Sequence, residues 1–399
     1  MAESAAMSLT TPRATPAGKA AATHAARLKL ASIARAPWEA LCVTAIEPNV
    51  FFDPGFAIAA TSLALGGKGA DALVAFDGAN RQRIMGLLPV VSAWQAYKLP
   101  VPALVALQPY SPLSTPLLDR DDAIAAAGAL IDGAAAAGAS LLVLPAMALD
   151  GPAAAAMHAA LAERGLRATT DRAHGRAAFD ATTGDVDSYL RAGMGAKKLK
   201  ELRRLRHRMD DDGTVALTIA STPATLRLAL DRFLELEARG WKGNLGTGLA
   251  QAQGDAAFIH AAAADLGARG AFDIAELTLD GTTVAAGLVL AQGDRAFFLK
   301  IAYDETMSRV SPGVQLTLDL TRHFAGNPAL ALVDSTADAG HPMIDHVWRE
   351  RLAIGDLLVP TRAGPLGAAL AGLVIGRRQA RDAAKRLRRF ARTFREKTS

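Results

Sequence analysis

The pattern of apolar and polar positions is most informative in the last third of the chain. Phe297–Tyr303 is a run of large apolar and aromatic residues, the composition of a half-buried strand. After a break at Ser311–Gly313, Leu316, Leu320 and Phe324 recur every four residues and predict a helix. The first N–H groups of a helix have no intrahelical partner, and the helix dipole adds partial positive charge there. This strand, break and helix start therefore predict a site for an anion such as phosphate.

Apolar periodicity in the rest of the chain predicts alternating strands and helices, which is typical of an α/β fold. Further strands are expected at Leu28–Ile33, Ala72–Phe76, Ile84–Val91, Leu104–Gln108, Leu141–Leu144, Val215–Ile219, Phe272–Leu279, Val284–Leu290 and Leu330–Asp334. Helices are expected at Pro37–Ile46, Asp53–Leu65, Asp121–Ala137, Met157–Glu163, Thr225–Arg239 and Gly254–Gly267. The order strand, two helices, hairpin, strand, break, helix and strand occurs twice, roughly 190–200 residues apart. We therefore expect two similar α/β halves in tandem.

Basic residues are unevenly distributed, although the net charge is a modest +5. Lys197–Met209 holds seven Lys and Arg against Glu201, and Arg377–Ser399 holds ten against Asp382 and Glu396. A nucleic-acid-binding domain usually spreads its basic charge over the folded surface and interleaves aromatic residues. Local basic runs instead favour small phosphate-bearing ligands or an anionic membrane surface.

Cysteine usage and hydropathy exclude several classes of protein. The single cysteine, Cys42, excludes an internal disulfide and a cysteine-based zinc cage, and it is expected to be a small buried apolar residue. The N-terminus lacks the continuous apolar stretch of a signal peptide. No apolar run approaches the roughly 20 residues that span a bilayer. We therefore expect a cytoplasmic protein.

Four segments, taken in order, resemble acetyltransferases of the GNAT superfamily. They are KKLKELRRLRHRM at Lys197–Met209, ARGWKG at Ala238–Gly243, FFLKIAYDE at Phe297–Glu305 and SPG at Ser311–Gly313. With their spacing they cover about Asp187 to Val359, and they look most like the branch linked to exopolysaccharide and cellulose biosynthesis, which is similar to Fem-type aminoacyl transferases. The resemblance implies tandem GNAT-like domains, each with a mixed central sheet flanked by helices.

The resemblance also implies acyl-CoA, such as acetyl-CoA, as co-substrate, with no metal. The residues that it places at the CoA phosphates are Arg309, Ser311, Gly313, Val314 and Gln315. Many GNAT proteins carry a loop of the form Q/R-x-x-G-x-G/A. Here Arg309 and Gly313 are four residues apart and no second glycine follows, so the loop departs from that pattern. Trp241 and Lys242 are placed near the acceptor by the same resemblance, or they only complete the core.

Acyl transfer needs a deprotonated acceptor, a polarised carbonyl and a protonated leaving thiolate. Lys300, Tyr303 and Asp304 stand at the end of the central strand, where the resemblance places the acyl group. Lys300 and Tyr303 are expected to face opposite sides of the sheet. The alternatives are an edge lysine, a core tyrosine and an aspartate that opens a turn. Further candidate catalytic groups are Asp334 and His341, at and just after the end of the last parallel strand.

Two basic segments have open alternatives. In Asp187–Met209, the residues Leu199, Leu202, Leu205 and Met209 share one helical face, so Lys200, Arg203, Arg204 and Arg208 are expected to face outward. That basic face is either solvated or lines the acyl-donor or acceptor groove. The tail is amphipathic in its second half, which is typical of a helix on an anionic membrane or a partner, or of one packed on its own domain.

The expected organisation is a disordered N-terminus (1–26), an N-terminal GNAT-like domain (27–186), a C-terminal GNAT acyltransferase domain (187–362) and a basic amphipathic helix (363–399). The predicted function is acyl transfer from acyl-CoA to an amine or hydroxyl, in polysaccharide or cell-envelope biosynthesis. The N-terminal half is expected to be an acceptor-side or structural domain. One alternative is a Fem-like transferase that uses aminoacyl-tRNA, although nucleic acid is otherwise not expected as a partner. Another is a non-catalytic scaffold of a polysaccharide-synthesis complex, docked through the basic tail. Whichever function holds, the basic tail allows a cytoplasmic location that is peripheral to the inner membrane.

Overall fold

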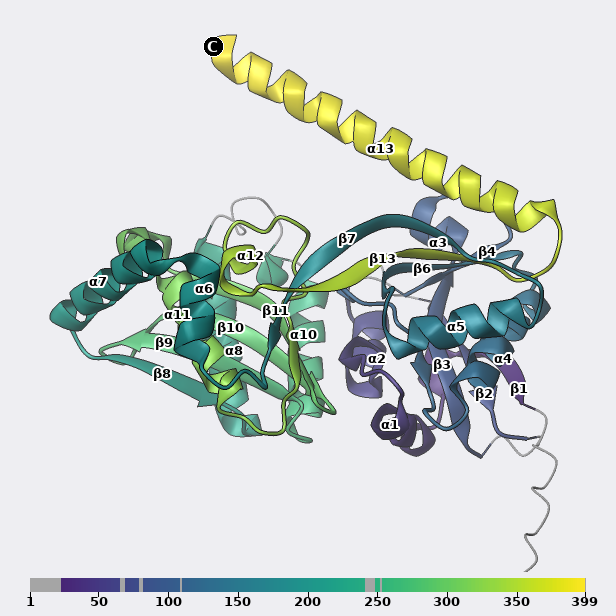
Figure 1. Ribbon diagram of the computed structural model, residues 1–399, viewed down its shortest axis with the longest axis horizontal. Coiled ribbons are helices and arrows are strands. Elements are labelled where there is room, and N and C mark those ends of the chain that lie inside the picture. The colour runs from purple at the N-terminus through teal and green to yellow at the C-terminus, as the bar shows by residue number, and fades with distance from the viewer. Residues whose placement is uncertain are drawn as a thin grey trace, which may run out of the picture.

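A single thirteen-stranded mixed sheet runs through the computed structural model, with helices on both faces (Figure 1). The structure describes residues 23–64, 69–78, 82–107, 110–240, 248–251 and 253–398, and it describes no side chain for 253, 382 or 385–398. Residues 1–22 of the expected disordered segment therefore lie outside the described residues, and the first strand begins at His24. The expected α/β class is confirmed, although the two expected central sheets are joined into one.

Each half supplies a similar set of elements. Those of the N-terminal half are β1 (His24–Lys29), α1 (Arg35–Thr44), α2 (Pro54–Ser62), β2 (Asp71–Phe76), β3 (Ile84–Ser92), α3 (Ala93–Tyr97), β4 (Ala103–Ala106), β5 (Leu117–Leu118), α4 (Ala123–Ala136), β6 (Leu141–Ala148), α5 (Pro152–Ala162) and β7 (Thr169–Asp180). Those of the C-terminal half are α6 (Val186–Met194), α7 (Ala196–Asp212), β8 (Val215–Ala220), α8 (Pro223–Arg239), α10 (Gln253–Gly267), β9 (Phe272–Leu279), β10 (Thr282–Gln292), β11 (Arg295–Tyr303), α11 (Pro312–Ala325), β12 (Leu332–Asp334), α12 (Ile344–Val347), β13 (Glu350–Pro360) and α13 (Pro365–Thr398). Short 3-10 turns η1 (Leu30–Ser32), η2 (Val50–Phe52), η3 (Leu249–Gln251) and η4 (Glu305–Val310) connect some of them.

The strand order shows that the halves exchange their last strands. The order is β1-β2-β3-β4-β6-β13-β7-β12-β11-β10-β9-β8. Each half contains one parallel pair, β4 with β6 and β11 with β12. The last strand of each half then pairs with the other half, so that β7 lies against β12 and β13 lies against β6. Figure 1 shows β7 and β13 as two long strands that cross together between the halves.

The two exchanged strands were not predicted from the sequence. They pair with each other in antiparallel orientation, from Glu350 opposite Ala178 to Leu358 opposite Thr169. The first half of β7 is polar and largely exposed, because it pairs there with β13 alone, and β12 pairs only with the last residues of β7. An alternation of apolar residues is absent from that stretch, and this alternation is the signal that identifies a strand. The expected boundary between residues 186 and 187 falls just after β7, and the domain division stays a prediction.

A shared apolar core holds the halves together beside the exchanged strands. Phe51 of η2 and Phe297 of β11 make an edge-to-face contact with ring centroids 5.3 Å apart. Phe56 of α2 and Phe258 of α10 make a similar contact at 5.1 Å. In the C-terminal half, α8 and α10 cover this face of the sheet, whereas α7 and α11 cover the opposite face with a separate apolar core. The expected outward face of α7 is confirmed, because its four apolar positions are buried and Lys200, Arg203, Arg204 and Arg208 are exposed.

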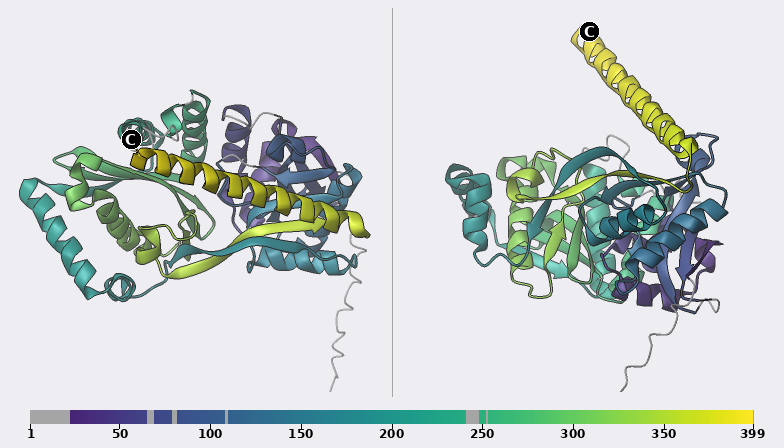
Figure 2. Two further views of the ribbon diagram at one scale, coloured as in Figure 1. Left: turned by 90° about the horizontal axis from the view of Figure 1, so that it is seen from above. Right: turned by 45° about the vertical axis from the view of Figure 1, so that its right-hand side comes forward.

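The long helix α13 packs on the body at its N-terminal end. Leu370, Ala371 and Val374 are buried against α3 and strands of the N-terminal half. Arg378 forms a buried ion pair with Asp356 of β13. Beyond this contact the helix projects away from the body, as the right-hand view of Figure 2 shows. None of the helices in the described part of the chain combines the length and the hydropathy that a membrane crossing requires.

The bulge in β13 should be intolerant of side chains. Gly355 lies where the register of β13 shifts against β6 and β7. A Cβ atom there would lie 2.7 Å from Leu149 Cδ1 and 3.1 Å from both Ala173 Cα and the Asp171 carbonyl oxygen. Gly355→Ala should therefore lower the free energy of unfolding by about 1–3 kcal/mol, the usual cost of overpacking. Chemical denaturation measures the change.

Gly372→Ala is the matched control for that substitution. Gly372 lies on an exposed face of α13, and a Cβ atom added there would have no atom within 4 Å. Ala is the better helix former, so this variant should be as stable as the parent or more stable by up to about 1 kcal/mol. Equal losses of stability in the two variants would show that the strand-exchange region is not tightly packed at Gly355.

Candidate functional site

A β-bulge in β11 aims two consecutive side chains at one face of the sheet. Leu288 of β10 pairs with Lys300, but Val289 pairs with Phe298, so Leu299 is an extra residue on β11. Before the bulge, Phe297 packs in the core under α8 and α10, and Phe298 in the core under α11. Leu299 and Lys300 then both lie on the α8 and α10 face, where alternation would have turned one of them away. The bulge therefore places Lys300 in the site.

The same strand separates from its parallel neighbour just before the bulge. Pairing of β11 with β12 covers Arg295 to Phe297, after which β11 continues to Tyr303. Thr336, which has a left-handed backbone at φ 52°, follows the end of β12. Its hydroxyl donates to the carbonyl oxygen of Phe298 at 2.9 Å and marks the start of the gap. The gap lies at the carboxyl ends of parallel strands, where α/β sheets usually bind ligands.

A cavity of about 290 Å³ opens beside this gap on the α8 and α10 face. Both halves of the chain line it. The lining residues are Tyr110, Ser111 and Pro112 from the N-terminal half, and Leu249, Phe258, Ile259, Leu299, Lys300 and Thr336 from the C-terminal half. The walls are mostly apolar, with Lys300 and the hydroxyls of Tyr110 and Thr336 among the polar groups. This combination is typical of a site for a small organic molecule.

Lys300 is held by a buried carboxylate that the sequence analysis missed. Its Nζ lies 2.5 Å from Oε1 of Glu237, which is only 2% exposed. The other oxygen, Oε2, accepts a hydrogen bond of 2.7 Å from the backbone N–H of Leu249. Glu237 stands four residues after Phe233, on the buried stripe of α8. A carboxylate on the apolar stripe of a helix is the signal that could have identified it, because such a group is buried only when it is paired.

A second polar pair joins the two halves beside the cavity, with Tyr110 from the N-terminal half and Asp255 from α10 of the C-terminal half. The Tyr110 hydroxyl donates to Oδ2 of the buried Asp255 at 2.7 Å, and its ring stacks on Phe258 with centroids 5.2 Å apart. Burial, together with the hydrogen bond to this carboxylate, raises the pKa of Tyr110 well above its ordinary value. The phenol therefore stays protonated at neutral pH. Sequence reasoning missed both residues, because they lie 145 positions apart and meet only in the folded chain.

The opposite face of β11 carries the predicted phosphate site. Tyr303 packs there, which confirms that it and Lys300 face opposite sides of the sheet. A Cβ atom on Gly313 would lie 2.9 Å from Cδ1 of Tyr303, so the close approach of this ring also requires glycine. Ser311 precedes α11 with a left-handed backbone, and its carbonyl oxygen accepts from the N–H groups of Val314 and Gln315. Because Pro312 has no N–H, the N–H of Gly313 is the remaining backbone donor of this turn that a ligand could bind.

The other predicted phosphate ligands have the following surroundings. Arg309 is exposed beside the start of α11, and its guanidinium lies 3.2 Å from Asp212 at the end of α7. The side chain of Gln315 is buried and donates to the carbonyl oxygen of Leu202 in α7 at 2.9 Å. It ties α11 to the basic helix. Trp241 and Lys242, the predicted acceptor contacts, lie outside the described residues.

Three further predicted catalytic residues have structural contacts. Asp304 accepts a hydrogen bond of 2.9 Å from the N–H of Thr306 and caps η4, in line with the turn-opening alternative. Asp334 is fully buried and forms an ion pair of 3.3 Å with Arg176 of β7. His341 accepts through Nδ1 from the N–H of Ile344 at 3.3 Å, at the start of α12. Across the part of the chain that the structure describes, no group of three or more His, Cys, Asp and Glu could hold a metal ion.

The corresponding helix start in the N-terminal half has the opposite charge. Asp119, Asp121 and Asp122 immediately precede α4, and Asp119 is paired with Arg83 at 3.0 Å. Carboxylates favour the positive end of a helix dipole, but they repel a phosphate. The start of α11 has Arg309 and no acidic side chain in its first turn. Electrostatics therefore favours the C-terminal half as the phosphate-binding half.

The Arg176–Asp334 pair should be needed for stability. Both side chains are almost completely buried, and Arg176 also donates to the carbonyl oxygen of Pro112 at 2.8 Å. Asp334→Asn leaves a buried guanidinium without its counter-charge, which should lower the free energy of unfolding by about 3–5 kcal/mol. Chemical denaturation measures it. Asp338→Asn, an exposed change in the following loop, is the control and should alter the stability by less than about 0.5 kcal/mol.

Comparison with known proteins identifies a domain in the C-terminal half. Residues 196–339 match the family model described as an acetyltransferase (GNAT) domain. The match runs from α7 to the loop after β12 and includes the bulged strand, the gap and the start of α11. This part of the chain is therefore a GNAT acetyltransferase domain. No curated protein sequence matches the chain at a significant level.

Solved structures extend the likeness to most of the chain. FemX is 10% identical with a TM-score of 0.52, covering 83% of this chain and 96% of that one. A conserved protein of unknown function from Bacteroides thetaiotaomicron is 14% identical with a TM-score of 0.51, covering 82% and 97%. A tandem GNAT protein from the clavulanic acid biosynthesis pathway is 15% identical with a TM-score of 0.41, covering 86% and 99%. At these identities the first two share the fold of this chain.

Proposed function

We propose that the C-terminal half transfers an acyl group from acyl-CoA to an amine or hydroxyl acceptor that enters between the two halves. The observation that carries this proposal is the course of β11. A bulge and a gap in the sheet are followed, at the end of the same strand, by the start of α11. The gap connects the two faces of the sheet, with the predicted phosphate site on one face and the cavity of about 290 Å³ on the other.

The phosphate face fits the CoA diphosphate through three features. The dipole of α11 favours an anion at Ser311, and the N–H of Gly313 is available as a donor. Arg309 supplies a cation, since its pair with Asp212 is exposed to solvent and can be exchanged for a phosphate. Bound there, acyl-CoA would supply the thioester whose acyl group is transferred. Tyr303 lies on this face against Gly313. We assign it the protonation of the leaving thiolate, because a phenol at that position is a proton donor.

The cavity face supplies the groups that act on the acceptor. The hydroxyl of Tyr110 donates to Asp255, so its oxygen can accept the proton of an attacking amine or hydroxyl while its own proton moves to the carboxylate. Lys300, held in place by Glu237, presents a positive charge that stabilises the negative charge developing on the carbonyl oxygen. The N-terminal half would thereby act on the acceptor side, as expected from the sequence.

The class of acceptor is a further part of the proposal. The resemblance to the branch linked to exopolysaccharide and cellulose biosynthesis supports a saccharide or cell-envelope precursor. A second candidate is aminoacyl transfer from charged tRNA, as in Fem-type transferases. The observation that favours it is the row of exposed cations on α7, which could contact a nucleic-acid backbone. The third candidate is a scaffold protein without catalytic activity, which would not need to bind acyl-CoA.

Removing either acceptor-side group should reduce turnover and leave acyl-CoA binding unchanged. Tyr110→Phe keeps the ring that stacks on Phe258, and Lys300→Gln keeps a donor for Glu237. Release of CoA from acetyl-CoA, assayed with a cell-envelope precursor extract, should fall about a hundredfold in kcat and in kcat/KM for at least one variant. Calorimetry with acetyl-CoA should give the parental Kd for both.

Lys200→Gln on the exposed face of α7 is the matched control and should retain full acetyl-transfer activity. Its activity also bears on the tRNA alternative, in which this face would be used. Near-parental turnover in both Tyr110→Phe and Lys300→Gln would remove the cavity from the reaction. Thermal stabilisation by uncharged tRNA and none by acetyl-CoA would replace the acyl-CoA proposal with the second candidate.

A larger side chain at the start of α11 should weaken acyl-CoA binding. Gly313→Val displaces the Tyr303 ring and crowds the N–H that would meet the diphosphate. The Kd for acetyl-CoA should rise at least tenfold, which is about 1.4 kcal/mol. Gly326→Ala, at the other end of α11, is the control, since its nearest atoms lie 3.5 Å from the added Cβ. An unchanged Kd in a folded Gly313→Val variant would contradict the phosphate site.

A further inference from the structure

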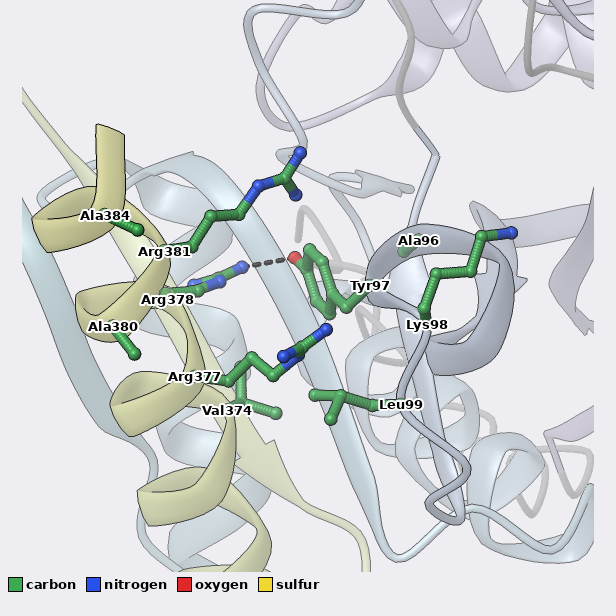
Figure 3. Close-up of a pocket in the computed structure, with 10 residues that line it drawn as sticks. All are labelled: Ala96, Tyr97, Lys98, Leu99, Val374, Arg377, Arg378, Ala380, Arg381 and Ala384. Atoms are coloured by element: carbon green, nitrogen blue, oxygen red, sulfur yellow. Dashed lines mark hydrogen bonds between the residues drawn. The ribbon is translucent and has the colours of Figure 1, made fainter. Parts of the chain in front are cut away.

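A separate groove of about 670 Å³ lies between α3 of the N-terminal half and α13, which packs on that half (Figure 3). It is distinct from the cavity beside β11, because the two share no lining residue. The floor is apolar, with buried Leu99 from the end of α3 and buried Val374 from α13. The walls include the small side chains of Ala96, Ala380 and Ala384, which leave the groove open above this floor. A groove of this kind has room for an apolar chain.

One of the arginines in the groove is already neutralised within the protein. Arg378 is buried, forms an ion pair with Asp356 and donates to the hydroxyl of Tyr97. Its guanidinium also lies over the Tyr97 ring at 4.7 Å from the centroid. These contacts join α13 to α3 and fix the width of the groove. Arg378 is therefore a structural part of the wall and is not available as a ligand.

The two neighbouring arginines have no such partners. Arg377 and Arg381 are exposed, lie one helical turn apart on α13, and extend toward Tyr97 from either side of Arg378 (Figure 3). Neither has an acidic partner among the side chains that the structure describes. Two guanidinium groups at the mouth of an apolar groove match a phosphate attached to an apolar chain, because each guanidinium can donate two parallel hydrogen bonds to phosphate oxygens.

The residues around the groove add further exposed apolar side chains and cations to the same face of the protein. Trp94 of α3 is 55% exposed, with the Lys98 amine 5.7 Å from its ring centroid. Leu373, one turn before Arg377 on the same row of α13, is 48% exposed. The chain beyond the groove, 385–399, contains seven Lys and Arg against Glu396. Exposed Trp and Leu beside clustered cations are typical of a helix that lies in the interface of an anionic membrane.

We propose that the groove between α3 and α13 binds the phosphodiester and the upper acyl chain of an anionic phospholipid and seats the protein on an anionic membrane surface. Arg377 and Arg381 bind the phosphate, and the accessible apolar surface of Ala96, Tyr97, Ala380 and Ala384, above the buried Leu99 and Val374, receives the chain. This inference does not depend on the proposed acyl transfer. An acidic protein segment would satisfy the two arginines, but it would leave the apolar floor without an occupant.

The test is partition of the full-length protein onto vesicles, measured by co-sedimentation. Vesicles of phosphatidylcholine are compared with vesicles of phosphatidylcholine and phosphatidylglycerol in a 7:3 ratio. The protein should bind the acidic vesicles and not the neutral ones. Arg377→Gln/Arg381→Gln removes two cations near the surface, each of which contributes about fivefold, so partition should fall roughly thirtyfold. Leu373→Gln should also lower it.

Arg203→Gln/Arg208→Gln is the matched control. It removes the same charge from the exposed face of α7, which lies at the far end of the molecule in Figure 1, so partition should stay within about threefold of the parent. Equal losses of partition in the two double variants would show that vesicle binding depends on net charge alone, and this would contradict a lipid site in the groove. Binding to neutral vesicles as strong as to acidic ones would overturn the role of the arginines.

Monomeric short-chain lipid separates the groove from the rest of the basic tail. Dihexanoylphosphatidylglycerol, kept below its micellar concentration, should bind the parent and lose at least tenfold in affinity with Arg377→Gln/Arg381→Gln. Glycerol 3-phosphate, which has the phosphate but no acyl chain, should bind at least tenfold more weakly than the lipid. Equal affinity for the two would show a phosphate site without a lipid site. Tighter binding of polyglutamate than of the lipid would assign the surface to an acidic protein partner.

Discussion

Antiparallel pairing of β7 with β13 is the interaction on which the rest of the structure depends. These strands lie side by side at the centre of the sheet. The last strand of the N-terminal half, β7, pairs with β12 of the C-terminal half, and the last strand of the C-terminal half, β13, pairs with β6 of the N-terminal half. The pairing fixes the distance between the halves and therefore the position of Tyr110 relative to Lys300. It is reinforced by a buried charge, since Arg176 of β7 bonds both Asp334 of β12 and the backbone at Pro112. The exchange thus helps to position the two walls of the cavity, together with the shared apolar core.

The two faces of β11 divide the work of the site. One residue of bulge at Leu299 reverses the alternation of the strand, so that Lys300 faces the cavity while Tyr303 faces α11. A regular strand would have turned Lys300 toward the core under α11 and away from Glu237. The groove between α3 and α13 lies in the other half, so membrane seating and acyl transfer would use separate surfaces.

Helices and hairpins of both halves could be predicted from the sequence, because amphipathic periodicity and turn residues are local signals. The start of α11 and the end of β11 could be predicted for the same reason. The exchanged strands could not, since β7 is polar where it crosses between the halves and its burial depends on a partner that is 170 to 190 residues away. The pairs Glu237–Lys300 and Tyr110–Asp255 likewise depend on tertiary contacts, and the bulge that aims Lys300 has no marker such as glycine.

Strand exchange also has a consequence for the order in which the protein can fold during synthesis. When the N-terminal half has left the ribosome, β6 still lacks its neighbour β13, which is among the last strands to be made. The nascent half therefore exposes an unpaired, strongly apolar edge throughout the translation of the second half. Its contacts have high sequence separation, and this makes closure of the sheet slow. A chaperone would therefore have a long time to bind β6 before β13 pairs with it.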